Sequence, residues 1–111
     1  MKIAVAAANG KAAGKVITEA VNRGHEVTAF GRRENNTAAT VYVQKDLFDL
    51  TAEDLKGFDA VVDAFGAWTE DTLSLHSSSL KHLCDILSGT DTRLLVVGQL
   101  FQFFKVYCIN T

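Results

Sequence analysis

The chain has 111 residues, of which 48% are apolar and 22% charged, and its formal net charge is −2. This balance predicts a single globular domain and excludes intrinsic disorder. Acids and bases are interspersed without a basic stripe, which argues against nucleic acid as the main partner, and no stretch approaches the ~20 apolar residues that span a membrane.

The first 30 residues have the pattern of strand, tight turn, helix and second strand. Residues 3–8 are apolar and uncharged, as in a strand that is buried on both faces. Helical spacing of apolar residues begins at Lys11 and ends at Gly24, and residues 27–30 form the next strand. The pattern is typical of a dinucleotide-binding unit, in which backbone N–H groups and the helix dipole hold a pyrophosphate.

A polar loop and a short strand follow this unit. The loop covers residues 31–37, and residues 41–43 are β-branched or aromatic, which predicts a strand. Thr51, with an acid three residues later at Asp54, is typical of a helix N-cap. We therefore expect a brief helix after Thr51 that ends at Gly57.

The remaining elements continue the alternation of strands and helices. Residues 60–65 predict a strand, and a longer helix is expected to begin near Thr69 or Asp71 and to end before Gly89. Residues 94–98 predict another apolar strand. The expected fold class is therefore α/β, a Rossmann-like doubly wound parallel sheet of five strands in the order 3-2-1-4-5.

The tail over residues 99–111 does not continue this alternation. It is rich in apolar residues but fits neither a helical nor a two-residue period, so its structure stays open. A fifth strand without a neighbour would expose its edge. We expect residues 100–109 to cover that edge within the chain or to pair with a second copy in a homodimer.

Cysteines and histidines show no spacing that predicts a special site. Cys84 and Cys108 belong to no C-x-x-C or Cys/His ligand pattern, so we expect reduced thiols in a cytoplasmic protein. His25, His76 and His82 do not share a helix face or a ligand spacing. We therefore expect no metal site.

Six segments, taken in order, carry a resemblance to a known family. They are A-A-N-G-K-A, R-G-H-E-V-T-A-F-x-R, K-D-L-F-D-L-T, D-A-V-V-D-A-F-G-A-W, L-H-S-S-S-L-K-H-L and T-R-L-L-V-V-G. Together they resemble the NmrA-like branch of the atypical short-chain dehydrogenases, whose bacterial members are described as NAD(P)H-binding proteins or "putative NADH-flavin reductases". The resemblance implies an NAD(P)-binding domain over residues 1–98 and a divergent tail over residues 99–111. Members of that family are longer, so the chain resembles a truncated N-terminal half.

The family's G-x-x-G-x-x-G turn corresponds to Ala7, Gly10 and Ala13 in this chain. The third position needs only a small residue for close packing of helix on strand. Ala7 is the larger departure, because its Cβ would either strain the turn or push the pyrophosphate outward. If the turn needs a left-handed residue, the strain is about 1 kcal/mol, close to a tenfold loss of affinity. The resemblance assigns cofactor contacts to the turn and the helix start, in a weakened form: Ala7, Asn9, Gly10, Lys11, Ala12 and Ala13.

The end of the second predicted strand carries two arginines. NAD-preferring proteins usually have an acid there, which accepts hydrogen bonds from the ribose 2′-hydroxyl. Here Arg32 and Arg33 take its place, and Arg32 matches a basic residue of the family. A guanidinium at this point favours the 2′-phosphate of NADP over NAD. The alternative is that both are solvated loop arginines.

Two further groups complete the predicted cofactor site. Asp46 and Leu47 resemble the family's adenine-contacting pair, although an acid at a strand end is often only a turn former. The resemblance places Ala64, Phe65 and Gly66 beside the nicotinamide ribose at the switch point of the sheet. Phe65 could equally be a core residue.

The acid/base residues of the short-chain dehydrogenases find no counterpart. That chemistry uses a serine after the fifth strand and a Tyr-x-x-x-Lys pair, whose lysine lowers the tyrosine pKa. Gln99 stands after the fifth predicted strand, and Tyr42 and Tyr107 are followed four residues later by Asp46 and Thr111. We therefore assign no catalytic residue.

Two functions remain open from the sequence. One is an NADP-dependent reductase that passes a hydride to a flavin-like acceptor, a reaction that depends on positioning more than on proton transfer. The other is a catalytically inactive module that binds a dinucleotide weakly or acts through protein contacts. The sequence does not identify a physiological acceptor.

Overall fold

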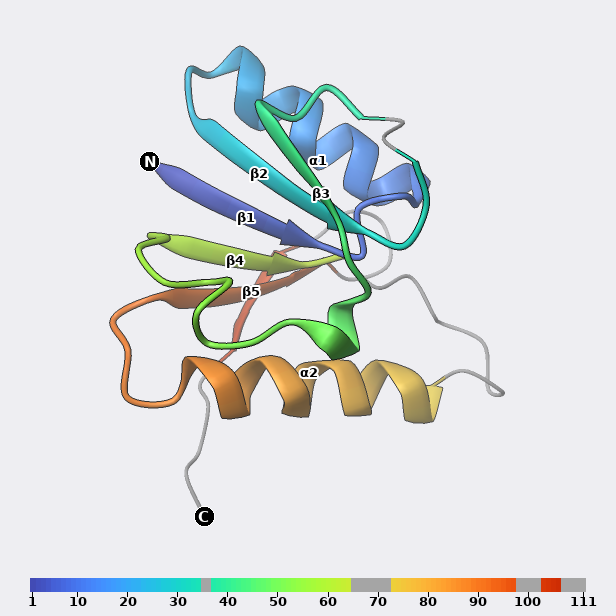
Figure 1. The fold of residues 1–111 in the computed structure, drawn as a ribbon. Coiled ribbons are helices and arrows are strands. Elements are labelled where there is room, and N and C mark those ends of the chain that lie inside the picture. Colours follow the sequence, from blue (N-terminus) through green and yellow to red (C-terminus); the bar gives the residue numbers. More distant parts are fainter. Residues whose placement is uncertain (35–36, 65–72, 98–102, 107–111) are drawn as a thin grey trace.

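One six-stranded sheet with a helix on each face forms the fold in the computed structural model (Figure 1). The structure describes residues 1–34, 37–64, 73–97 and 103–106. The strands are β1 (Lys2–Ala6), β2 (Glu26–Gly31), β3 (Val41–Gln44), β4 (Ala60–Asp63), β5 (Arg93–Val97) and β6 (Phe103–Val106). The helices are α1 (Lys11–Asn22), α2 (Leu73–Leu87) and the short 3-10 helix η1 (Leu47–Asp49).

The order of the first five strands confirms the prediction. They run parallel in the order β3-β2-β1-β4-β5. At the end of β1, Ala6 lies between Phe30 of β2 and Asp63 of β4, so β1 is the central strand of the parallel part. The fold is therefore the expected doubly wound, Rossmann-like sheet.

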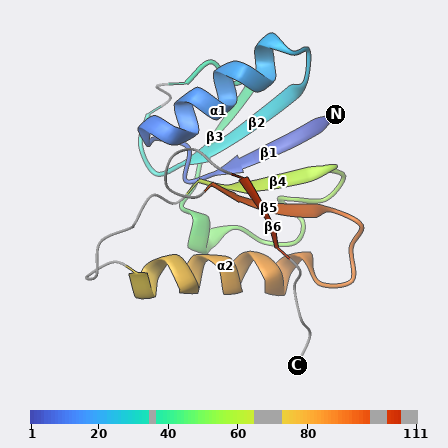
Figure 2. The same cartoon turned by 180° about the vertical axis from the view of Figure 1, so that it is seen from behind.

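A sixth strand settles part of what the sequence left open about the tail. β6 runs antiparallel beside β5, with a register from Leu94 opposite Val106 to Val97 opposite Phe103 (Figure 2). The expectation that the tail covers the edge of the fifth strand within the chain is thus confirmed for residues 103–106. β5 is an internal strand and offers no open edge to a second copy.

Alternate residues of the central strands supply two separate cores. Ala4 and Ala6 of β1 belong to the cluster beneath α2, whereas Val5 belongs to the cluster beneath α1. On the α2 side, Phe30 and Phe58 meet edge to face with ring centroids 6.5 Å apart. Burial of both faces explains why these strands are apolar throughout instead of alternating with polar residues.

The two helices end close to where the sequence predicts. α1 has 12 residues and is followed by Gly24, whose φ of +85° is the left-handed conformation that stops a helix. α2 ends at Leu87, and its predicted start near Thr69 or Asp71 falls outside the described residues. Within the described ranges, neither helix is long and apolar enough to cross a membrane.

The prediction of a brief helix after Thr51 is wrong, because a turn occupies residues 52–57. The expected cap is nevertheless present. The Thr51 N–H donates to Asp54 Oδ2 at 2.9 Å, and the Asp54 N–H donates to the Thr51 hydroxyl at 3.4 Å. Gly57, with a φ of +86°, follows too soon for a stable helix to propagate. The helical turn forms earlier, at η1, whose N-cap is Asp46.

Cys84 corrects the expectation of reduced thiols, because it is disulfide-bonded in the structure. It lies on α2 and packs, half-buried, against the core beneath that helix. Cys108, the other cysteine of the sequence, lies outside the described residues. The expectation rested on the lack of a C-x-x-C or Cys/His pattern, and sequence spacing of this kind does not report distances in the folded chain.

Candidate functional site

The carboxyl ends of the parallel strands meet the start of α1 at one edge of the sheet, on the right in Figure 1. β1 ends at Ala6, three residues follow, and Gly10 is the N-cap of α1. The Gly14 N–H donates to the Gly10 carbonyl at 3.0 Å, which begins the helix. Doubly wound folds have their main ligand-binding crevice at this edge, beyond the carboxyl ends of the strands.

Ala7 occupies the left-handed region, with a φ of 58°. It corresponds to the first glycine of the predicted turn, so the chain does hold a side chain where glycine is preferred. The left-handed conformation costs the folded chain about 1 kcal/mol of strain. The loss of cofactor affinity expected from the sequence stays a prediction.

The rest of the turn is open on one side and packed on the other. Gly10 is exposed, and a Cβ built on it would meet nothing within 4 Å. Ala13 is fully buried beneath α1, in keeping with a position that needs a small residue. Lys11 and Ala12 are the first two residues of the helix. Because the N-cap residue is glycine, it has no side chain that could cover the start of the helix.

Arg32 and Arg33 follow β2 directly and are exposed at this same edge. Arg32 Nε lies 3.8 Å from Asp46 Oδ2, and the Arg32 side chain remains 70% exposed. The pair brings two predicted cofactor residues together. An exposed ion pair of this kind is worth at most about 1 kcal/mol, so a stronger anion can take over the guanidinium.

Asn9 connects the turn to the arginines, and this contact was not foreseen from the sequence. Its Oδ1 accepts a hydrogen bond from the Arg33 N–H at 3.0 Å. Its Nδ2 lies 3.1 Å from the hydroxyl of Tyr42, a residue of β3 that the sequence singled out only as an unsuitable catalytic tyrosine. Tyr42 lies in a short edge strand, and the spacing of residues in the sequence does not indicate that its side chain reaches across β2 to Asn9.

Asp46 and Leu47 each have a structural role in the fold. Asp46 Oδ1 accepts from the Phe48 N–H at 3.0 Å and so caps η1, as the turn-former alternative implies. Leu47 is only 3% exposed and belongs to the core beneath α2. A contact of either residue with adenine stays a prediction, and the Leu47 side chain is committed to the core.

The end of β4 contributes a buried polar pair to the same edge. Asp63 and Ser79 are both fully buried, and the Ser79 hydroxyl donates to Asp63 Oδ2 at 3.0 Å. Next to them, Ala64 is 5% exposed, and its N–H donates to the Ala6 carbonyl at 3.2 Å. The other two residues predicted beside the nicotinamide ribose, Phe65 and Gly66, lie outside the described residues.

The profile of a family described as NAD(P)H-binding matches residues 7–103 of the chain. The chain belongs to this NAD(P)H-binding family. The match begins at the left-handed residue of the turn and ends at the first residue of β6, so it includes β2 to β5 and leaves out β1.

Three relatives of this NAD(P)H-binding chain are longer proteins. The uncharacterized protein YwnB of Bacillus subtilis is 46% identical over 101 residues, which are 88% of this chain and 47% of YwnB. A crystal structure from Streptococcus pneumoniae, described as "a putative NADH-flavin reductase", is 58% identical with a TM-score of 0.83 and covers 88% of this chain and 47% of its own. The structure of the Lmo0794 protein of Listeria monocytogenes is 44% identical with a TM-score of 0.75, and the match covers 88% of this chain and 59% of Lmo0794. The chain therefore spans about half the length of the first two.

The described residues fit the nicotinamide dinucleotide that the family name implies. Open space around Gly10 leaves room for a pyrophosphate against the backbone, and the start of α1 carries N–H groups and the positive end of the helix dipole. Arg32 and Arg33 add positive charge at the end of β2. These features occur at one edge of the sheet, as the family's ligand requires.

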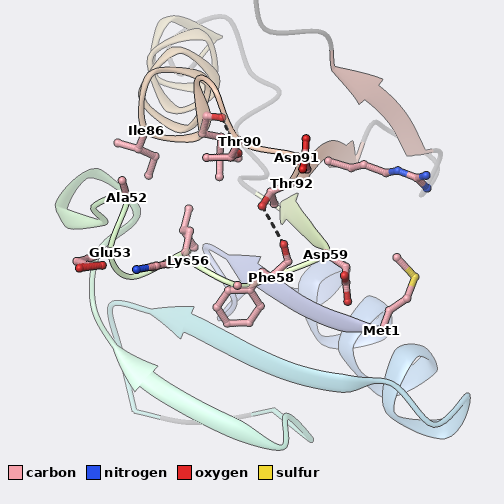
Figure 3. A pocket seen from close by; sticks show the side chains of 14 residues that line it. Met1, Ala52, Glu53, Lys56, Phe58, Asp59, Ile86, Thr90, Asp91 and Thr92 are labelled. Atoms are coloured by element: carbon pink, nitrogen blue, oxygen red, sulfur yellow. Dashed lines mark hydrogen bonds between the residues drawn. The ribbon is translucent and has the colours of Figure 1, made fainter.

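A hollow of about 870 Å³ lies at the opposite edge of the sheet, where the parallel strands begin (Figure 3). The turn after η1, the end of α2 and the loops before β4 and β5 line it. Its charged side chains are of both signs, with Glu53, Asp59 and Asp91 against Lys56 and Arg93. Among the described residues, none that is predicted to contact a cofactor lines this hollow.

Proposed function

We propose that the chain binds NADP(H) at the edge formed by the turn of residues 7–13, and that it prefers NADP(H) to NAD(H). The observation that carries the proposal is the position of Arg32 and Arg33. Both are exposed directly after β2, beside the turn that would hold the pyrophosphate. A guanidinium forms paired, charge-assisted hydrogen bonds with a phosphate but gains little from a ribose hydroxyl.

Each part of the site has one task in this proposal. The N–H groups at the start of α1 bind the pyrophosphate, and the open backbone at Gly10 lets it approach. Arg32 turns from Asp46 toward the 2′-phosphate, which costs little because their contact at 3.8 Å is exposed. Ala64, the residue directly after β4, forms the floor of the site beside β1.

Parallel titrations of NADPH and NADH by calorimetry test the proposal. We expect NADPH to bind at least about tenfold more tightly, since a hydrogen-bonded charge pair contributes roughly 1.5–3 kcal/mol. Arg32→Ala should remove most of this preference and leave NADH binding within about twofold. Arg23→Ala removes a cation at the far end of α1, where Arg23 pairs with Glu19, and is the matched control. Equal affinities for both cofactors in the unaltered chain would refute the preference.

Hydride transfer to a flavin-like acceptor is the second proposal, and the name of the Streptococcus pneumoniae relative favours it. A bound NADPH would supply a hydride from nicotinamide C4 to the flavin, which also takes a proton from solvent while the nicotinamide is oxidised. Following NADPH absorbance with free flavin tests this separately from binding. Tight NADPH binding without oxidation above the buffer rate would leave the chain a binding module without turnover.

A further inference from the structure

The side-chain amide of Asn9 joins the turn to the segment that follows β2. Its Oδ1 accepts from the Arg33 N–H at 3.0 Å, and its Nδ2 donates to the Glu34 carbonyl at 3.3 Å. Asn9 precedes the N-cap of α1, so these bonds fix the arginine segment relative to the helix start. Asn9 Nδ2 also donates to the Tyr42 hydroxyl, so both polar atoms of the amide bind protein groups. The Asn9 side chain therefore points toward the protein and not toward a ligand.

Tyr42 holds the same segment from β3. Its hydroxyl accepts from Asn9 Nδ2 at 3.1 Å and donates to the Arg33 carbonyl. Its ring packs against the core beneath α1, which fixes the direction of the hydroxyl. The backbone N–H and carbonyl of Arg33 are therefore both held, one by Asn9 and the other by Tyr42.

Gly31 shows how closely these groups approach one another. It is the last residue of β2 and is buried. A Cβ built on it would overlap both Asn9 Oδ1 and the Tyr42 hydroxyl, which lie against its backbone. A side chain at this position would displace the Asn9 amide or the Tyr42 hydroxyl, so the glycine at residue 31 leaves the space that the network occupies.

We infer that Asn9 and Tyr42 form a clamp that positions Arg32 and Arg33 at a fixed distance from the pyrophosphate-binding turn and thereby sets the preference for a dinucleotide with a 2′-phosphate. The inference rests on the proposed function. The pyrophosphate and the 2′-phosphate belong to one ligand, so their binding groups must be spaced correctly at the same time. Fixing the Arg33 backbone before binding reduces the conformational entropy lost on binding. NADH lacks the 2′-phosphate and gains nothing from this arrangement.

Tyr42→Phe is the direct test, because it removes the hydroxyl and keeps the ring in the core. We expect NADPH affinity to fall about fivefold, as for one ordinary hydrogen bond, and NADH affinity to stay within about twofold. Thr90→Val is the matched control. It removes another hydroxyl hydrogen bond, from Thr90 to the Leu87 carbonyl at 2.7 Å, at the opposite edge of the sheet. It should leave the ratio of the two affinities unchanged even where it lowers thermal stability.

A second variant and a second readout test the clamp without any cofactor. In the unaltered chain the Arg33 amide should be protected from hydrogen exchange, and Tyr42→Phe and Gly31→Ala should each raise its exchange rate about tenfold or more. A retained NADPH preference in Tyr42→Phe, or an Arg33 amide that exchanges freely in the unaltered chain, would overturn the clamp alone. An unaltered chain without NADPH preference would overturn the proposed function together with the clamp.

Discussion

The Ala8 N–H donates to the Phe30 carbonyl at 3.0 Å, directly after Ala7 has taken a φ of 58°. The bond ties the turn after β1 to the end of β2. It also requires the chain to bend sharply at Ala7, because Ala6 is still paired with both neighbouring strands. The left-handed alanine is thus part of the hydrogen-bonded turn that joins β1 to the end of β2.

Replacing Ala7 by glycine should therefore raise stability without changing affinity. Glycine removes about 1 kcal/mol of strain and costs part of that through a more flexible unfolded chain, so we expect a net gain of about 0.5 kcal/mol in the free energy of unfolding. The dissociation constant of NADPH should stay within about twofold. Urea unfolding and calorimetry measure the two quantities.

Ala8→Gly is the control for this change, made at the next residue. Ala8 is fully buried and does not have a positive φ, so glycine there loses a core methyl and should destabilise the chain by about 1 kcal/mol. Loss of stability in Ala7→Gly would contradict the strain at residue 7. Tenfold tighter NADPH binding in that variant would show that the strain acts on binding after all.

Asp54 should make stability depend on pH in the acid range. The hydrogen bond from Lys45 Nζ at 2.8 Å, followed by that from the Thr51 N–H, holds the pKa of Asp54 below its ordinary value of 3.8. A carboxyl with a lowered pKa in the folded state stabilises the fold above its unfolded pKa. That contribution is lost as the pH falls through the folded pKa.

The Asp54→Asn variant tests this dependence. It should be less stable than the unaltered chain at neutral pH, by on the order of 1 kcal/mol, and the difference should shrink as the pH falls below 3.8. Asp49→Asn, at an exposed residue of η1, is the control and should keep the unaltered acid dependence. A constant difference between Asp54→Asn and the unaltered chain at all pH values would contradict the account.

Pairing of β6 with β5 predicts different effects of proline at two adjacent positions. In an edge strand, alternate N–H groups point toward the neighbouring strand. Phe104 lies opposite Val96 and Lys105 opposite Leu95. Proline at one of these two positions should therefore remove a hydrogen bond to β5, and proline at the other should remove only an N–H that points outward. We expect unequal losses of thermal stability, with faster amide exchange in β5 for the more damaging variant. Two prolines without effect would mean that β6 does not pair.

The sequence predicted the sheet because the same physical cause acts on every residue of a strand. Ala4 and Val5 point to opposite cores, and burial of both leaves the continuous apolar run that identifies β1. Gly24 likewise ended α1 because its left-handed conformation is a local property. Such local signals identified the individual elements, and the right-handed connection of alternating strands and helices supplied the strand order.

Other features depend on distances that spacing does not encode. The contact between Asn9 and Tyr42 joins residues 33 apart, and the bond from Ser79 to Asp63 joins a helix to a strand. The disulfide at Cys84 has the same character. The helix predicted after Thr51 failed for another reason, since a correct cap was followed by too few residues before the next stop.

The location of the bound cofactor is the most direct test of the central claim. Adding NADPH to the isotope-labelled chain and recording amide resonances should shift those of residues 10–13 and of Arg32 and Arg33. Amides around the hollow at the opposite edge, such as Lys56 and Thr92, should not move. Shifts confined to that hollow, or none at saturating NADPH, would contradict a dinucleotide site at the start of α1.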